Sequence, residues 1–236
     1  MIQAISLARV IEELAYTEAP ARNAVGAFQS TEQLLGSSAH LEAAFSGLFG
    51  FIAFHAKHDS SVREYIEGGS VCEDAGKNIM VLILSSDPCA FAKDLKPAML
   101  IGDIRVSYPS HPAYELVNSV FPAEPRPALP GLLLFDKLSG VGSAVYVSLS
   151  DCETSKEVGD LCREVFTLAE NAFVRGGSSG WIDRISAKLE SKGIVHKRTG
   201  HMGLREWLAI ALNHAKILGT TLVALVPKVA SKLMGL

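Results

Sequence analysis

The segment from Ile79 to Leu84 is apolar at every position and is followed by Ser85-Ser86. It is short for a helix, and no polar residue alternates with the apolar ones. Strands that are buried on both faces have this pattern, and they are most common in parallel sheets covered by helices. The segment therefore predicts a central strand of an α/β sheet.

The residues after this segment predict alternating helices and strands. A turn at Ser86-Asp87-Pro88 precedes a helical stretch at 90–95 and an apolar, strand-like stretch at 99–108. Further elements are expected as a helix at 111–121, two strands at 130–135 and 144–149, and a helix at 155–173. The predicted order is β-α-β-α-β-β-α, in which the early strands pair in parallel and the last two form a hairpin.

The flanking sequences read as helical. Apolar residues recur every three or four positions in residues 1–57, and residues 204–217 and 218–235 are apolar enough for two more helices. Gly68-Gly69-Ser70 and the glycine- and serine-rich stretch 175–180 look like boundaries. We therefore expect a helical N-terminal region (1–75), an α/β domain (76–174) and a basic, apolar, helical C-terminal extension (181–236).

The composition and the absence of certain motifs exclude several classes of protein. The chain has 48% hydrophobic residues, which excludes wholesale disorder, and its start has no basic segment typical of a signal peptide. The four cysteines form no Cys-x-x-Cys pair, and the seven histidines form no metal-binding pattern. No phosphate-binding glycine motif occurs. We expect a cytoplasmic protein with free thiols, no metal and no nucleic-acid partner.

The C-terminal quarter differs in charge from the rest. Residues 173–236 hold 10 basic and 3 acidic residues, although the whole chain has a net charge of -3. This segment could pack on the acidic remainder of the chain, or its residues 204–236 could associate with anionic lipid. Asn213, His214 and Lys216 interrupt its apolar run, which favours packing.

Two motifs carry a resemblance to a known family. The segment Cys89-Ala90-Phe91-Ala92-Lys93 continues to Pro97, and a second segment reads Pro130-Gly131-Leu132-Leu133-Leu134-Phe135. With the predicted order of elements, the chain resembles the thioredoxin-like superfamily, with Cys-x-x-Ala in place of Cys-x-x-Cys. The resemblance implies a thioredoxin-like core, in which Leu129-Pro130 is cis and faces the loop that contains Cys89.

The resemblance also indicates which thiol chemistry the chain can perform. Because position 92 is Ala, the resolving thiol of a dithiol cycle is missing. Cys89 at a helix N-terminus could still be a reactive thiolate, although Asp87 opposes its ionisation. Cys72 is a remote candidate for a resolving thiol, whereas Cys152 and Cys162 read as ordinary buried or half-buried thiols.

These observations leave three functions open. The first is a non-dithiol module that binds a protein or peptide through Pro88, Leu129 and Pro130, by pairing of the backbone beside a cis-proline with an extended ligand. The second is a monothiol redox enzyme that uses Cys89 as its catalytic residue. The third is a membrane-associated effector that acts through residues 204–236. No cofactor is expected, with glutathione left open as a ligand of the same site.

Overall fold

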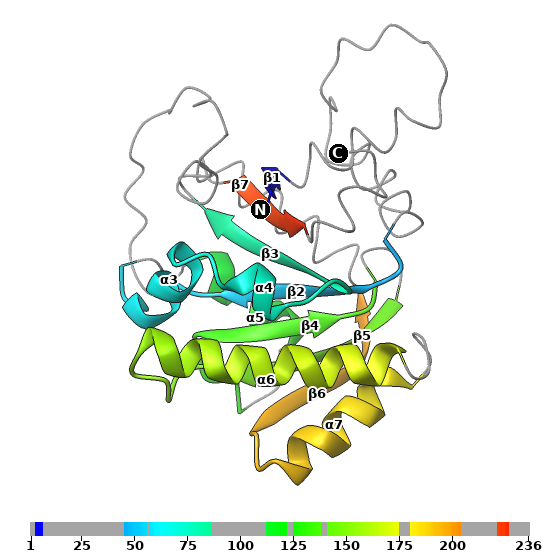
Figure 1. Ribbon diagram of the computed structural model, residues 1–236. Helices are drawn as coiled ribbons and strands as arrows, with labels where there is room; N and C mark the ends of the chain where they lie inside the picture. Colours follow the sequence, from blue (N-terminus) through cyan, green and yellow to red (C-terminus); the bar gives the residue numbers. More distant parts are fainter. Residues whose placement is uncertain are drawn as a thin grey trace, which may run out of the picture.

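The structure is a computed structural model, and it describes residues 3–6, 45–55, 57–85, 112–121, 125–137, 141–174, 180–203 and 221–226 (Figure 1). The fold is mixed α/β, with a seven-stranded sheet in the order β1-β7-β3-β2-β4-β5-β6. The strands are β1 (Gln3–Ser6), β2 (Leu48–Ala53), β3 (Ile79–Ser85), β4 (Gly131–Phe135), β5 (Val141–Ser148), β6 (His196–Gly203) and β7 (Thr221–Val226). The helices are α3 (Ser60–Glu67), α4 (Val71–Asp74), α5 (Pro112–Val120), α6 (Ser155–Val174) and α7 (Trp181–Ser191).

The strand directions are mixed. β2 runs parallel to β3, with Leu48 opposite Ile79, and antiparallel to β4 on its other side. β4 and β5 form an antiparallel hairpin, and β6 extends the sheet beyond β5. On the opposite side, β7 lies between β3 and β1 and is antiparallel to both.

Helices cover both faces of this sheet. The apolar residues of α3, α6 and α7 form one cluster with alternate residues of the strands, such as Ile52, Val81 and Leu132. Figure 1 shows α6 running along this face. On the other face, Phe49 stacks on Phe135 with ring centroids 5.7 Å apart. Phe121, directly after α5, packs edge-on against Tyr146 on that same face.

The sequence of α6 explains both its start and its buried face. Thr154 and Glu157 form a capping box: the Glu157 carboxylate accepts from the Thr154 backbone N–H, and the Thr154 hydroxyl accepts from the Glu157 backbone N–H. Small and apolar residues then recur every three or four positions and are buried, namely Val158, Gly159, Cys162, Val165, Phe166, Ala169 and Ala172.

Most of the central elements were predicted. The strand at 79–84 is present as β3, and its residues Ile79 to Ile83 are all 0% exposed. The hairpin β4–β5, the helix α5 and the helix α6 are confirmed, each within a few residues of the predicted bounds. The helix predicted at 90–95 and the strand predicted at 99–108 lie outside the described residues.

The flanks differ from the prediction. The helical prediction for residues 1–57 is wrong at Gln3–Ser6 and Leu48–Ala53, and the helix predicted at 218–235 is wrong at Thr221–Val226. His196–Gly203, in the extension predicted to be helical, is also a strand. Short segments that are apolar on every side fit a buried helix and a buried strand equally well, and here sheet pairing decides.

The partner of β3 is a second correction. The predicted β-α-β order suggested a parallel partner later in the chain, whereas β2 precedes β3 and is its parallel neighbour. The sheet thus takes strands from all three of the regions into which the sequence was divided.

Candidate functional site

Two loops meet at one end of the sheet. β2 ends at Ala53, which lies opposite Gly131, the first residue of β4. The β2–α3 loop, residues 54–59, and the loop that precedes β4, residues 125–130, therefore leave the sheet side by side. We refer to this end of the sheet as the loop site.

Asp59 organises the β2–α3 loop. It is the N-cap residue of α3, yet its side chain makes no capping hydrogen bond to that helix. Instead, its Oδ2 accepts a hydrogen bond from the backbone N–H of His55 at 2.6 Å and another from the Tyr114 hydroxyl. Because Tyr114 belongs to α5, this carboxylate ties the loop on one side of the sheet to the helix on the other.

Two histidines lie on the same loop. The rings of His55 and His58 pack edge to face with centroids 4.5 Å apart. His55 Nδ1 accepts a hydrogen bond from the backbone N–H of Lys57 at 3.1 Å, so neutral His55 carries its proton on Nε2. Burial and the neighbouring His58 lower the pKa of His55, and the nearby Asp59 carboxylate opposes them. His55 is thus favoured as a neutral imidazole.

The loop before β4 is held at three points. The Pro130 carbonyl accepts from the Leu149 backbone N–H at 2.8 Å, and the Ala128 carbonyl accepts from the Tyr146 hydroxyl at 2.7 Å. The Lys197 ammonium of β6 donates to the Pro125 carbonyl. These bonds fix the course of the chain from Pro125 to Pro130.

Leu129 lies between Ala128 and Pro130, whose carbonyl groups are both hydrogen-bonded. The Leu129–Pro130 peptide bond is cis, and Leu129 is half-buried while Pro130 is buried. Neither the N–H nor the C=O of Leu129 has a hydrogen-bond partner in the described part of the chain. Within the described residues, the loop thus presents one backbone donor and one backbone acceptor without a partner.

Gly131 lets Tyr146 reach the Ala128 carbonyl. A Cβ at position 131 would lie 2.0 Å from Tyr146 Oη and 2.7 Å from the Val147 carbonyl oxygen. Burial raises the pKa of Tyr146, and the negative charge of Asp59 raises it further, so this hydroxyl stays protonated and donates. Asp59 orders the first loop and Tyr146 anchors the second, and the charge of Asp59 acts on the Tyr146 hydroxyl.

The predicted site residues are only partly covered by the structure. Cys89 and Pro88 lie outside the described residues, so their predicted approach to Pro130 stays a prediction. Leu129 and Pro130 lie at the loop site. Sequence reasoning missed His55, Asp59 and Tyr114, because residues 48–57 were expected to be helical and the loop after β2 was therefore not foreseen.

Two cysteines can be judged from their surroundings. Cys162 is buried and Cys152 is half-buried, as the sequence predicted, and both are free thiols. Burial raises the pKa of the Cys162 thiol, as does the charge of its neighbour Cys152. Burial followed by Glu157 and Asp151 raises the pKa of Cys152. Neither is poised to act as a thiolate.

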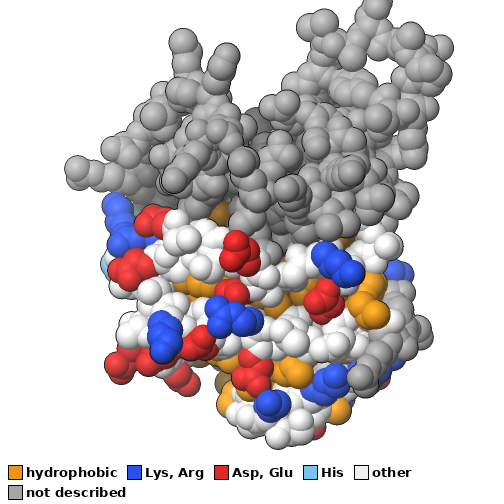
Figure 2. Space-filling view, viewed as in Figure 1, with side chains coloured by type: hydrophobic (Ala, Val, Ile, Leu, Met, Phe, Trp, Pro, Cys, Tyr) orange, Lys and Arg blue, Asp and Glu red, His pale blue; other side chains and the backbone are white. Residues whose placement is uncertain are grey.

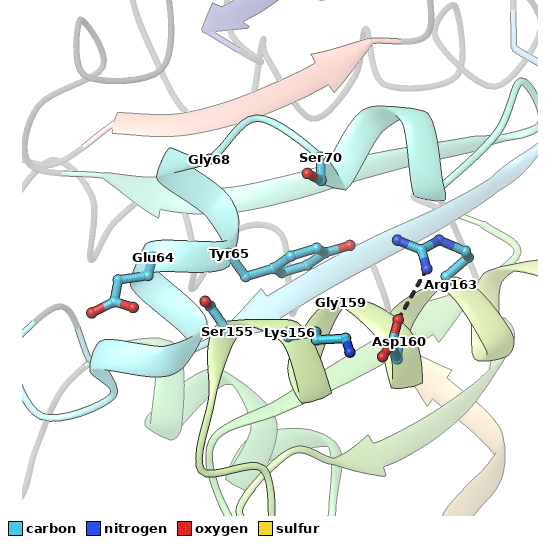
Figure 3. A pocket seen from close by; sticks show the side chains of 9 residues that line it. All are labelled: Glu64, Tyr65, Gly68, Ser70, Ser155, Lys156, Gly159, Asp160 and Arg163. Atoms are coloured by element: carbon cyan, nitrogen blue, oxygen red, sulfur yellow. Dashed lines mark hydrogen bonds and ion pairs between the residues drawn. The ribbon is translucent and has the colours of Figure 1, made fainter.

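A hollow lies between α3 and α6, apart from the loop site (Figure 3). It has a volume of about 310 Å³, and its lining includes Tyr65 from α3 and Gly159 and Arg163 from α6. The surface over α3, α4 and α6 carries acidic and basic side chains interspersed (Figure 2).

Comparison with family models, curated proteins and solved structures finds no match to this chain. Among the residues the structure describes, no three His, Cys, Asp or Glu side chains are grouped to hold a metal ion. No helix in the described ranges is both long and apolar enough to cross a membrane. The loop site is therefore interpreted from its own geometry.

Proposed function

We propose that this chain is a divergent thioredoxin-like protein that binds an extended protein or peptide segment at the loop site, without dithiol chemistry. This proposed site differs in one respect from the site expected from the sequence. The strand that leads into the site is β2, and the loop after it, residues 54–59, takes the place that the sequence analysis gave to the loop with Cys89.

The order of elements supports this assignment. From Leu48 to Val174 the chain runs β2, α3 with α4, β3, α5, β4, β5 and α6. Among the described elements, with residues 86–111 outside them, this matches the β-α-β-α-β-β-α order expected of a thioredoxin-like core, beginning one strand earlier than the sequence suggested. The first two strands are parallel and the last two form an antiparallel hairpin, as that order requires.

The residues after β2 support binding without thiol exchange. The segment from Phe54 to Arg63 reads FHAKHDSSVR and contains no cysteine. Asp59 stands at the N-cap of the helix that comes next, the position where a thioredoxin-type protein would carry its attacking thiol. A carboxylate held by Tyr114 and by the His55 N–H can order the loop, but it cannot exchange disulfides.

The Leu129 N–H and C=O, which have no partner among the residues that the structure describes, carry the proposal. An extended peptide that runs beside residues 128–130 can accept from the Leu129 N–H and donate to its C=O, in the manner of strand addition. The anchors at Pro125, Ala128 and Pro130 hold the loop in one conformation, so little ordering entropy is lost on binding. The exposed His58 and Lys57 lie on the neighbouring loop, where they can contact ligand side chains.

The other two functions have less support. The monothiol enzyme requires Cys89, which lies outside the described residues. The membrane effector required helices in residues 204–236, and Thr221–Val226 is instead a strand paired with β1 and β3.

The test is a peptide screen on the full chain, followed by amide-resolved NMR titration of the tightest binder. We expect peptide binding to shift the Leu129, His55 and His58 amides, and His58→Ala to weaken it, whereas the exposed Lys137→Ala should not. Binding that shifts amides of α7 and leaves Leu129 unchanged would refute the proposal. Catalytic insulin reduction abolished by Cys89→Ser would favour the monothiol enzyme.

A further inference from the structure

β6 is an end strand of the sheet and has a neighbour on one side only. It pairs with β5 in antiparallel register, with Val147 opposite His196 and Tyr146 opposite Lys197. Figure 1 shows β6 beyond β5, with α7 beside it. In the part of the chain that the structure describes, no strand pairs with the other edge of β6. A strand edge of this kind can pair with an added extended segment.

The hydrogen bonds of β5 identify which backbone groups lie at this open edge. The Leu149 N–H donates to the Pro130 carbonyl, so Leu149 turns its backbone groups towards β4. Because this direction alternates along a strand, Tyr146 turns its backbone groups towards β6 and bonds its partner there. The neighbours of that partner, His196 and Arg198, therefore turn their N–H and C=O groups away from β5. These four groups form the open edge.

The open edge is accessible and regular. Within the described residues, the N–H and C=O groups of His196 and Arg198 have no hydrogen-bond partner. The Arg198 side chain is 56% exposed, and Val195, directly before the strand, is 82% exposed. β6 contains no proline, and the irregularity in its pairing with β5 falls beyond Thr199. Residues 196–199 thus lack the proline or bulge that often blocks pairing at a natural edge.

The charge around β6 determines which extended segment fits this edge. The segment 181–203, from α7 to β6, holds five basic and two acidic residues. Glu164 of α6 pairs with Lys192 of this segment, and Arg198 pairs with Asp183 inside it. With these ion pairs counted, an excess of two positive charges remains. A second copy of the chain would bring the same positive charge against β6, whereas an acidic segment compensates it.

We propose that the open edge of β6 binds an acidic, extended segment of a partner protein as an added strand. The backbone of this segment accepts from the N–H groups of His196 and Arg198 and donates to their C=O groups. Its acidic side chains face the positive charge of α7 and of Lys197, and an apolar side chain can pack on the exposed Val195. The ligand proposed for the loop site lies beside residues 128–130 instead, so the two proposals are independent.

The test is hydrogen exchange measured by NMR on the isotope-labelled full chain. In the free protein, the amides of Lys197 and Thr199 should exchange slowly, because they bond β5, and those of His196 and Arg198 should exchange rapidly. The blocked peptide acetyl-EVEVEV-amide should slow exchange of the latter two at least about tenfold at saturation, and acetyl-KVKVKV-amide should not.

Three results would overturn the proposal. Protection of the His196 and Arg198 amides in the free chain would show that the edge is already occupied, and a dependence on protein concentration would identify a second copy as the occupant. Equal protection by the basic peptide would remove the role of charge. Effects of the acidic peptide confined to the Leu129 amide would place it at the loop site.

A proline variant tests the backbone contact. His196→Pro removes an outward N–H and no bond to β5, and proline is tolerated at such an edge position, so the thermal midpoint should change little. Peptide binding should weaken about tenfold. His196→Ala, which also loses the imidazole but keeps the N–H, is the matched control and should bind like the parent. Proline and alanine variants that bind equally well would refute the added strand.

A charge variant tests the choice of an acidic ligand. Arg198→Gln keeps the outward N–H and lowers the positive charge, so it should weaken binding of the acidic peptide about two- to fivefold. The exposed Lys137→Ala, which lies outside this segment, should not. Binding that is unchanged in Arg198→Gln and insensitive to salt would contradict recognition of an acidic segment.

Discussion

Tyr114 donates its hydroxyl hydrogen bond to Asp59, and this bond joins helices that lie on opposite faces of the sheet. Asp59 stands at the start of α3, and Tyr114 stands in the first turn of α5. The same Asp59 oxygen holds the backbone N–H of His55. The conformation of the β2–α3 loop thus depends on a residue of α5, far along the chain.

Replacing Tyr114 with Phe should destabilise the protein by about 1.5–3 kcal/mol, because a hydrogen bond to a charged acceptor is lost. Urea unfolding measures this change. Tyr65→Phe is a matched control, since it removes the comparable bond to Asp74. Only Tyr114→Phe should shift the His55 amide resonance, and equal shifts in both variants would contradict the role given to Tyr114.

Gly131→Ala should destabilise the fold by at least about 1–3 kcal/mol through overpacking. The added Cβ would overlap Tyr146 Oη and also approach the Val147 backbone, which cannot rotate away. Adding Tyr146→Phe should therefore not restore stability. Gly50→Ala in β2 is the control, because its Cβ would meet its nearest neighbour at 3.4 Å. A Gly131→Ala protein as stable as the parent would show that this close approach is absent.

The free energy of unfolding should fall as the pH is lowered, because His55 takes up a proton more readily in the unfolded chain. Its pKa is lower in the folded protein than in the unfolded chain, owing mainly to burial and then to His58. The unfolded state therefore binds more protons, and stability is lost as pH falls through the unfolded value of about 6.5 towards the folded one. His55→Gln should flatten this part of the pH profile of the urea midpoint. An unchanged profile would count against a half-buried, neutral His55.

The two described cysteines should differ in accessibility. In a Cys72→Ser, Cys89→Ser background, a thiol reagent should modify Cys152 slowly and Cys162 only after unfolding, since Cys162 is fully buried and both thiol pKa values are raised. Mass spectrometry with and without denaturant measures this order. Rapid labelling of Cys162 under native conditions would contradict the packing of α6 against α3.

Trp181 should contribute to stability through packing alone. Its side chain is 0% exposed and its indole N–H has no acceptor within the described structure. Trp181→Ala should cost about 3–5 kcal/mol, as is typical of large core truncations. Trp181→Phe should cost much less, because no hydrogen bond is lost with the indole. Similar losses in both variants would reveal a partner for the N–H.

Prediction from the sequence worked best for segments whose length, flanking residues or periodicity indicate one type of secondary structure. The hairpin β4–β5 and the spaced apolar residues of α6 each fit a single element type, and the run Ile79 to Leu84 is short and followed directly by Ser85-Ser86, which favours a strand; all three are present. The β2 segment LFGFIA failed because a segment buried on all sides has no periodicity. Only long-range pairing with β3 and β4 identifies it as a strand.

The candidate site was predicted only in part, for the same reason. Leu129 and Pro130 were found from a local motif before a strand. The contribution of Asp59 and Tyr114 depends on two helices meeting across a sheet end, and their separation of 55 residues leaves no local pattern. Because β2 was not recognised as a strand, the loop between β2 and α3 could not be recognised either.

The place of β7 has a consequence for synthesis on the ribosome. β3 needs a neighbour on each side, and on one side Val81 pairs with Leu225 of β7. Until that late segment has been translated, the nascent chain displays β3 with one row of unpaired backbone groups, beside some of its most apolar residues. Newly made chains are thus exposed to faulty strand pairing for most of their translation, and a chaperone that shields an apolar strand edge would act on this protein before its sheet can close.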